Sequence, residues 1–258
     1  MKGKNYFFTS RLVCFNETFA SMANCMDTCV LWHEAISGRS ANDVASSFFK
    51  IIKRNSPPLN HYIFWADNCG PQNKNWILYS ALLQLVNSVS GPQSITLRYL
   101  EKGHTFMRCD SIHGLIGKRL KHTSEVLDYE DLLRLISSSK QDIAVAPLSA
   151  IDFFQFPSFK TRNTGLPKLR GLKEVHFQKG SPNLMYKRDL DARAYFIRKF
   201  AMLEIPGLPL SSGNIRGINV AKKAAICAQL VPQMPVDKRR FWLDLPESSV
   251  TDLCEEVQ

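Results

Sequence analysis

The sequence has no run of about 18 consecutive apolar residues, the length that a membrane-spanning helix requires. Its first ten residues lack a continuous apolar core and an Ala-x-Ala-type cleavage site, so nothing in them indicates a secretory signal peptide. Internal repeats and low-complexity tracts are also missing. We therefore expect a globular protein of the nucleus or cytoplasm that is neither secreted nor embedded in a membrane.

The cysteines lack the even number and close spacing of a disulfide framework. Seven of them are scattered along the chain, which favours reduced thiols. Cys25, Cys29 and His33 are spaced by four residues, a spacing that would place them on one face of a helix. They leave open the alternative of a zinc site that is one ligand short.

Acidic residues are scarce between residues 160 and 240, where 17 Lys and Arg residues stand against five Asp and Glu, a net charge of +12. The whole chain carries +10, so this segment accounts for its basic character. Such a segment favours a polyanion partner, DNA first, and the alternative is a solvated surface without a ligand. The sequence makes no prediction about oligomerisation. The candidate nucleic-acid-binding residues are three basic pairs with aromatic residues between them: Lys187 and Arg188, Lys222 and Lys223, Arg239 and Arg240.

What the chain does have is an alternation of strand and helix patterns, which indicates an α/β fold. The run 61–66 is almost entirely apolar, so we expect a central strand buried on both faces. The strands are expected to share one mixed sheet flanked by helices. Strands are predicted at 6–16, 29–34, 61–66 and 94–100, and helices at 40–53, 75–89, 111–122 and 129–137.

The composition changes after residue 156, where Pro157, Gly165, Pro167 and Gly171 predict a linker. We therefore divide the chain into a core, residues 1–156, and a small basic C-terminal α+β module, residues 157–258. Within the module we expect a hairpin formed by 172–178 and 184–189, and helices at 190–203 and 217–230.

Asp67 follows the apolar strand directly, at the carboxyl end where open α/β sheets place their active sites. Asn68, Asn73 and Lys74 lie close behind it in the sequence. A carboxylate with amide neighbours can supply part of a site for Mg²⁺ or Mn²⁺, but metal-assisted phosphoryl transfer requires at least two converging acidic groups. The alternative is that Asp67 only caps the turn before the next helix.

Asp110, His113 and Gly117 are spaced by three and four residues, so they would lie on one face of the helix predicted there. That face can contribute a second carboxylate to the metal site. In the alternative, Asp110 is a helix cap and His113 an ordinary half-buried polar residue. Gly117 is unusual in either case, because glycine inside a helix costs about 1 kcal/mol relative to alanine.

Four runs in the same order, residues 8–19, 31–39, 65–76 and 103–113, carry a resemblance to a known family. Over roughly residues 6–155 the chain resembles transposon-derived proteins with a ribonuclease H-like, DDE-transposase-type domain (domain of unknown function 7869). The run 234–242 resembles the tail of the same family. The resemblance implies a ribonuclease H-like mixed sheet and two-metal catalysis, with Asp67 on the fourth strand and Asp110 and His113 on a late helix.

The chain departs from the family pattern in two ways that remove carboxylates from the implied metal site. The family usually carries an Asp-bearing strand upstream of the first run, where this sequence has only Met1 to Phe7. Family members also tend to have Glu at the position of Gly117. We therefore expect an N-terminally truncated copy, in which residues 6–16 and 61–66 pair directly or leave a slot.

Three functions follow from these patterns. The preferred hypothesis is a transposase- or integrase-like protein that is catalytically inactive. In that case the remnant site binds Mg²⁺ or Mn²⁺ through Asp67 and Asp110, or binds no metal. The first alternative is a non-catalytic nucleic-acid-binding protein. The second is an active metal-dependent nuclease or transposase whose missing acidic group comes from Glu17 or Glu34.

Overall fold

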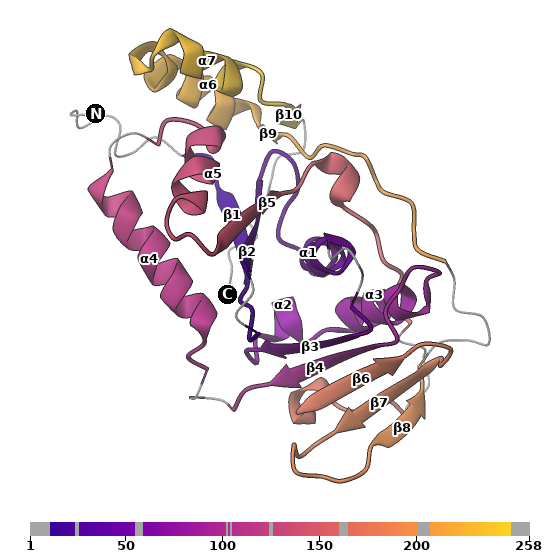
Figure 1. The fold of residues 1–258 in the computed structure, drawn as a ribbon. Coiled ribbons are helices and arrows are strands. Elements are labelled where there is room, and N and C mark those ends of the chain that lie inside the picture. Colours follow the sequence, from indigo (N-terminus) through magenta and orange to yellow (C-terminus); the bar gives the residue numbers. More distant parts are fainter. Residues whose placement is uncertain are drawn as a thin grey trace. The chain divides into compact units, whose positions relative to one another are not determined.

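The computed structural model describes residues 11–23, 26–54, 59–101, 103, 105–123, 126–159, 165–200 and 207–248. They belong to two compact units, and each unit combines a mixed β-sheet with helices, so the fold is mixed α/β (Figure 1). Each unit draws on both of the predicted segments, 1–156 and 157–258. Unit 1 comprises residues 1–38, 107–151 and 213–258, and unit 2 comprises residues 39–106 and 152–212.

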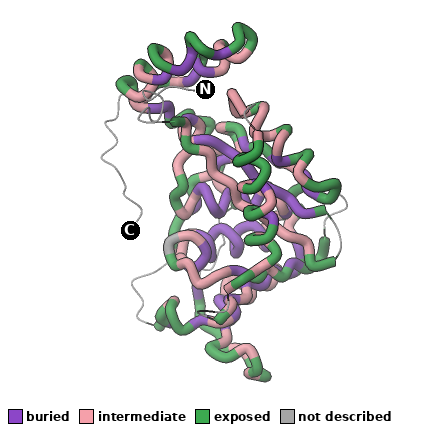
Figure 2. Tube along the Cα trace, turned by 90° about the vertical axis from the view of Figure 1, so that its left-hand side faces the viewer, coloured by how far each residue is buried: buried purple, intermediate pink, exposed green. Residues whose placement is uncertain are grey.

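Unit 1 is built around a three-stranded sheet whose central strand is buried along its whole length. Figure 2 colours the trace by burial, and buried segments in purple lie inside exposed ones in green. The first strand pairs with the central strand in antiparallel and the third in parallel orientation. Two helices bury isoleucines against one face of the central strand, at Cys29 and Leu31. The elements, in the sheet order β1-β2-β5, are β1 (Cys14–Phe19), β2 (Asp27–His33) and β5 (Ile143–Pro147), with helices α4 (Arg108–His122) and α5 (Tyr129–Ser137).

A second, smaller core of unit 1 is formed by the C-terminal segment, where Ile218, Ile226 and Trp242 pack around Ala35. Gly217 precedes this core with a φ of 74°, and a Cβ at this position would lie 2.5 Å from the backbone of Glu247. Glycine is therefore required there. The elements are the parallel pair β9 (Ile218–Asn219) and β10 (Glu247–Ser248), with α6 (Val220–Gln229), the 3₁₀ turn η4 (Val231–Gln233) and α7 (Val236–Leu243).

Unit 2 contains a five-stranded sheet in the order β3-β4-β6-β7-β8, parallel between β3 and β4 and antiparallel elsewhere. Figure 1 shows its helices on one side of β3 and β4. We call that side the inner face and the opposite side the outer face. The elements are α1 (Ala41–Arg54), β3 (His61–Ala66), α2 (Gly70–Asn73), α3 (Trp76–Asn87), β4 (Ser94–Tyr99), β6 (Glu174–Gln178), β7 (Asn183–Lys187) and β8 (Phe196–Lys199), with the 3₁₀ turn η3 (Leu169–Gly171). A further 3₁₀ turn, η2 (Ala150–Asp152), lies where the chain passes from unit 1 to unit 2.

The expectation of one sheet with a central strand at 61–66 is wrong. The four predicted strands divide between the two sheets, and β3 is an edge strand whose one described partner is β4. Ile63 and Trp65 on its outer face are 54% and 39% exposed. An apolar run therefore marks a strand here but does not show that both of its faces are covered. The described residues place β1 in the sheet of unit 1 and β3 in the sheet of unit 2, and residues 6–10 of the first predicted strand lie outside them.

Of the other predicted elements, most are confirmed and some are wrong. The structure confirms strands or helices at most of the predicted positions, and α5 coincides with its predicted bounds. The first strand begins at Cys14 and ends at Phe19, later than predicted, while residues 6–10 lie outside the described part. Segment 190–203, predicted as a helix, contains strand β8 instead. No helix among the described residues is long and apolar enough to span a membrane.

Candidate nucleic-acid interface

Asp67 lies directly after β3 in unit 2 and accepts hydrogen bonds from within its own turn. Its Oδ1 accepts from the backbone N–H of Cys69, at 3.1 Å, and from Nδ2 of Asn73, at 2.6 Å. The neighbouring Asn68 donates to the carbonyl oxygen of Leu100 at the end of β4. This is the bonding of a turn-capping carboxylate, and it commits one oxygen of Asp67 to the protein.

Lys74 closes the same turn from inside the unit. Its Nζ donates to Oδ1 of Asn68, at 2.8 Å, and to the carbonyl of Leu172, at 2.6 Å, and lies 4.3 Å from the centre of the Tyr99 ring. Burial, and then the nearby charge of Lys173, lower the pKa of Lys74 to about 8, against the opposing effect of Glu101. The amine is thus a buried structural donor, and it places no positive charge at the surface.

Asp110 and His113 lie on α4 in unit 1. Asp110 occupies the third helical position, and its Oδ2 accepts from the backbone N–H of Met107, at 2.7 Å, which caps the helix. His113 Nε2 lies 2.8 Å from Oγ1 of Thr18 on β1. Gly117 faces open space, since a Cβ added to it would have no other atom within 4 Å. The helix therefore presents a cap and a strand contact where a metal-binding face was expected.

The described residues show no donor set of the kind that a two-metal site needs. Two-metal cleavage requires several carboxylates that converge on the ions. Within the ranges that the structure describes, no three His, Cys, Asp or Glu side chains come together in a way that could hold a metal. Asp67 belongs to unit 2 and Asp110 to unit 1. Glu34, one of the substitute ligands considered, has its Oε1 engaged by Lys222, at 2.5 Å, and by the backbone N–H of Val13, at 2.7 Å.

The zinc alternative also changes its geometry in the structure. Cys29 and His33 lie on the same face of strand β2, four residues apart, and not on a helix. Cys25 lies outside the described residues. His33 is 7% exposed and its Nδ1 has no hydrogen-bond partner among them, while its ring contacts Tyr129 and Phe241 edge-on. Burial lowers the pKa of His33 to about 4, although Glu34 opposes the shift.

Most of the predicted nucleic-acid-binding residues have protein partners. Lys222 pairs with Glu34, Lys223 with Glu247 at 3.1 Å, and Lys187 with Glu174 at 3.6 Å. These three cations are less than one-fifth exposed. Two more of the predicted residues, Arg239 and Arg240, lie on α7. Arg239 donates to the carbonyls of Met234 and Pro232, and Arg240 forms an exposed pair with Asp244.

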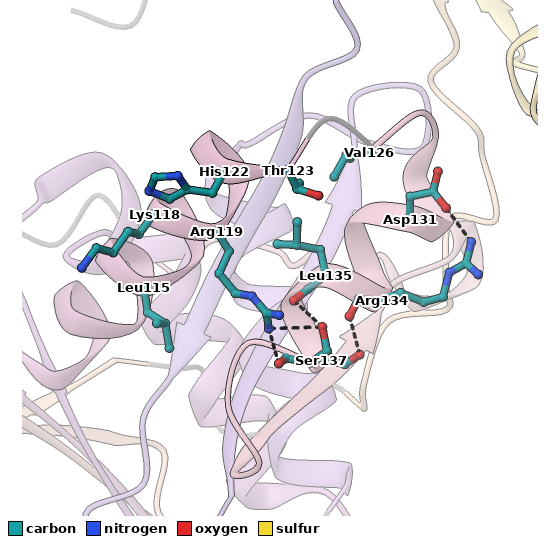
Figure 3. A pocket seen from close by; sticks show the side chains of 11 residues that line it. Leu115, Lys118, Arg119, His122, Thr123, Val126, Asp131, Arg134, Leu135 and Ser137 are labelled. Carbon is teal, nitrogen blue, oxygen red and sulfur yellow. Dashed lines mark hydrogen bonds and ion pairs between the residues drawn. The ribbon is translucent and has the colours of Figure 1, made fainter.

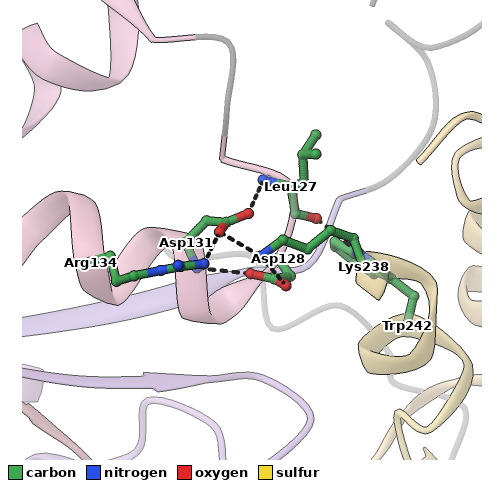
Figure 4. A network of polar contacts seen from close by, with 6 residues as sticks. All are labelled: Leu127, Asp128, Asp131, Arg134, Lys238 and Trp242. Carbon is green, nitrogen blue, oxygen red and sulfur yellow. Dashed lines mark hydrogen bonds and ion pairs between the residues drawn. The ribbon is translucent and has the colours of Figure 1, made fainter. Parts of the chain in front are cut away.

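The basic tail segment 234–242 contains most of α7, and its side chains contact the start of α5. Lys238 Nζ lies 2.9 Å from Asp128 and 2.5 Å from Asp131, and Trp242 Nε1 donates to the carbonyl of Leu127 (Figure 4). Asp128 is also the N-cap of α5, since its side chain accepts from the N–H of Asp131. The segment that resembles the family's tail therefore completes the fold of unit 1.

A groove of about 850 Å³ lies between α4 and α5, where Lys118, Arg119, His122 and Arg134 line it (Figure 3). Its cations are partly neutralised. Arg134 pairs with Asp131 at 2.5 Å, and Arg119 donates to the carbonyl of Ser138. With Asp131 in its wall, the groove is a mixed polar surface and no strong anion site.

Arg188 belongs to a more strongly cationic pocket of about 710 Å³ in unit 2. Lys168 and Arg170 reach it from the segment around η3, Arg188 from the end of β7 and Arg198 from β8. All four side chains are exposed, no carboxylate is among the residues that line the pocket, and none of the four forms an ion pair with a described residue. We call this the cationic pocket.

The sheet register explains how the cationic pocket is assembled. Tyr186 on β7 lies opposite Phe196 on β8, and the two rings stack at 5.4 Å. Since alternate residues of a strand share a face, Arg188 and Arg198 lie on the same side as these rings. The guanidinium of Arg188 lies 5.8 Å from the centre of the Phe196 ring. The pocket thus combines four cations with the ring of Tyr186 in its wall.

Sequence reasoning found Arg188 and missed the other three pocket cations. Arg198 lies in the segment 190–203, for which a helix is predicted, although the alternation Phe196-Ile-Arg198 indicates a strand. Lys168 and Arg170 lie in the predicted linker, where alternating basic residues were the available signal.

The comparisons give a family for the chain. The model of a domain of unknown function (DUF7869) matches residues 27–177, more than half of the sequence. The chain belongs to this family. Comparison with curated proteins and with solved structures gives no match. The family's matched region runs from β2 to β6 and so includes Asp67, Asp110 and His113.

Proposed function

We propose that this DUF7869 protein binds nucleic acid without cutting it, through the cationic pocket of unit 2. The observation that carries the proposal is the group of four exposed cations, Lys168, Arg170, Arg188 and Arg198, with no carboxylate among the described residues of the pocket wall. Like charges held close together repel, and a polyanion relieves that repulsion. Arginine suits this role because its planar guanidinium can donate two parallel hydrogen bonds to a phosphate.

The proposal includes descent from a transposase with a ribonuclease H-like core. The family model covers residues 27–177, which include three of the four runs that carry the resemblance. The order of β1, β2, α1, β3, α3 and β4 is compatible with such a core. Asp67, Asp110 and His113 would then be remnants of a site for Mg²⁺ or Mn²⁺. We propose no cleavage, because Asp67 and Asp110 are committed to caps and Gly117 supplies no oxygen ligand.

The binding test uses the complete chain and a fluorescent DNA duplex titrated over a range of salt concentrations. Affinity should fall as salt rises, with a log–log slope of about −0.9 for each phosphate contacted. The Arg188→Glu/Arg198→Glu variant should bind at least 10-fold more weakly and show a shallower slope. The control is Lys118→Glu/Lys121→Glu on α4, which changes the net charge equally and should have the smaller effect. An equal loss in both variants, or no binding by the unmodified chain at about 50 mM salt, contradicts the proposal.

The activity test adds Mg²⁺ or Mn²⁺ to the same protein with single-stranded and duplex DNA. We expect no cleavage and no strand transfer. Metal-dependent cleavage that Asp67→Asn abolishes would establish the active-nuclease alternative and show that the acidic remnants still assemble a site.

A further inference from the structure

The outer face of the unit 2 sheet has side chains from five strands and keeps apolar groups in solvent. One row crosses the whole sheet through the pairs Ile63–Thr96, Thr96–His176, His176–Met185 and Met185–Ile197. Ile63 and Ile197, at its two ends, are both 54% exposed. These two side chains are therefore accessible to a ligand at both ends of the row, and it is the row beside them that indicates a binding surface.

The next row is aromatic and cationic. Trp65 lies opposite Arg98, Arg98 opposite Glu174, and Glu174 opposite Lys187. The guanidinium of Arg98 lies 5.4 Å from the centre of the Trp65 indole, and Trp65 remains 39% exposed at the sheet edge. Tyr195 folds over the same row, with the Lys187 amine 4.8 Å from its ring centre.

The carboxylate in this row is neutralised within the protein. Glu174 is 1% exposed, lies 2.6 Å from Arg98 and accepts a hydrogen bond from the hydroxyl of Tyr195. Burial opposes its ionisation, but the bonds from Tyr195 and Arg98 outweigh burial and hold the pKa of Glu174 below its usual range. Glu174 is the one acidic residue on the outer face of the five strands. Against it stand Arg98, Lys187 and, by strand alternation, Lys199.

We propose that the outer face is a stacking platform for single-stranded nucleic acid, with Trp65 as the ring on which a base stacks, and with the exposed Lys199 and the partly exposed Arg98 as phosphate contacts. The inference rests on the proposed function, because it specifies which form of nucleic acid the protein prefers. Single strands expose the flat faces of their bases, and a duplex does not. Stacking of a base on an aromatic side chain contributes about 1–3 kcal/mol per base and tolerates any sequence.

The sheet geometry makes this platform compatible with the cationic pocket. In β8, Arg198 points to the pocket side and Lys199 to the outer face, so the two surfaces meet at one exposed edge strand. The outer face from β3 to β8 spans four interstrand spacings, about 19 Å at ~4.8 Å each. A flexible single strand can therefore cross the platform and turn around β8 toward the pocket.

The test compares labelled oligo(dT) of about 12 nucleotides, within the usual range for such surfaces, with a duplex of the same length. Trp65→Ala should weaken oligo(dT) binding about 10-fold and leave duplex binding within about 2-fold, since one base loses its stacking partner. Trp65→Phe should restore most of the affinity. Phe106→Ala removes another exposed aromatic of unit 2, one outside the strands, and should change neither affinity.

A second measurement needs no variant. Trp32 and Trp242 are 0% and 8% exposed and Trp76 is half-buried, so Trp65 is the tryptophan most accessible to a ligand. Oligo(dT) should quench the tryptophan fluorescence of the unmodified chain, and the duplex should not. Unchanged oligo(dT) binding in Trp65→Ala, with duplex binding intact, overturns the platform and leaves the proposed function standing. Binding of neither nucleic acid overturns both. Self-association that Trp65→Ala abolishes, without an effect on oligo(dT), assigns the face to a second copy instead.

Discussion

At the scale of single residues, two buried ionisable side chains of unit 1, Asp27 and His33, differ in whether they have a hydrogen-bond partner within the part of the chain that the structure describes. Asp27 is fully buried, and both Nε and Nη2 of Arg108 contact its Oδ2, at 3.2 and 2.9 Å. His33 differs, because its buried Nδ1 has no partner among the described residues. A buried group without a partner avoids charge, because burial disfavours its charged form. His33 is therefore expected to make the stability of unit 1 depend on pH.

The first prediction concerns His33. Its pKa is about 4 in the folded chain and about 6.5 in an unfolded one. As pH falls from about 6.5 to 4 the unfolded chain takes up a proton that the folded chain refuses, so stability is lost over that window and no further below it. The loss should approach roughly 3 kcal/mol at ~1.4 kcal/mol per pKa unit.

Denaturant unfolding at pH 7 and pH 4.5 measures this loss, with His33→Phe as the comparison. Phenylalanine keeps an aromatic ring between Tyr129 and Phe241 and cannot be protonated. The variant should lose clearly less stability than the unmodified chain on acidification. Equal losses would show that other groups control the acid response.

At the scale of secondary-structure elements, local patterns were reliable and strand environment was not. Tyr129–Ser137 has its N-cap at Asp128 and an apolar stripe, and both signals are local, so its bounds were predicted correctly. Strand β8 has neither a cap nor an apolar stripe, its alternation covers only four residues, and its position is set by pairing with β7. The candidate site followed the same rule. The sequence predicts that Asp67 follows a strand, because that signal is local. The cationic pocket is not predictable in this way, because it combines residues around η3 with the register between β7 and β8.

The second prediction concerns Gly117 in α4. A methyl group added at this position meets no atom within 4 Å, and the backbone is helical, so alanine fits without strain. Gly117→Ala should stabilise unit 1 by about 0.5–1 kcal/mol, because glycine loses more conformational freedom on folding. Gly217→Ala is the opposite case, since its φ is 74° and Glu247 crowds the new methyl. Thermal melts should rise for the first variant and fall for the second; a fall for Gly117→Ala would refute the interpretation of an open, regular helix face.

At the scale of the whole molecule, the two units differ in how they depend on the C-terminal segment. Unit 1 takes α6, α7 and the short strands β9 and β10 from residues 213–248, and unit 2 takes nothing from them. Trp242 and Lys238 join that segment to α5, and Lys222 joins it to Glu34. The family match, which ends at residue 177, leaves this segment out.

The third prediction is that a chain ending at residue 212 loses protection in unit 1 and keeps it in unit 2. Removing the segment uncovers Ala35 and the ring of His33 and leaves Asp128 and Asp131 without Lys238. Hydrogen exchange should become faster in β2, at residues 27–33, and stay unchanged in β4, at residues 94–99. Equal protection of β2 in both chains would show that unit 1 is stable without its C-terminal part.

The ion pair between Glu34 and Lys222 joins residues 188 positions apart, so it can form only long after Glu34 has been synthesised. A ribosome adds about 5–20 residues per second, so about 10–40 s pass between the appearance of β2 and that of α7. During that interval the apolar side chains of β2 and Ala35 have left the ribosome while part of their cover has not yet been made. Unit 2 receives its last strand earlier, at residue 199. All strands of unit 2 are therefore synthesised before unit 1 is complete, and slower translation lengthens the interval in which β2 and Ala35 lack part of their cover.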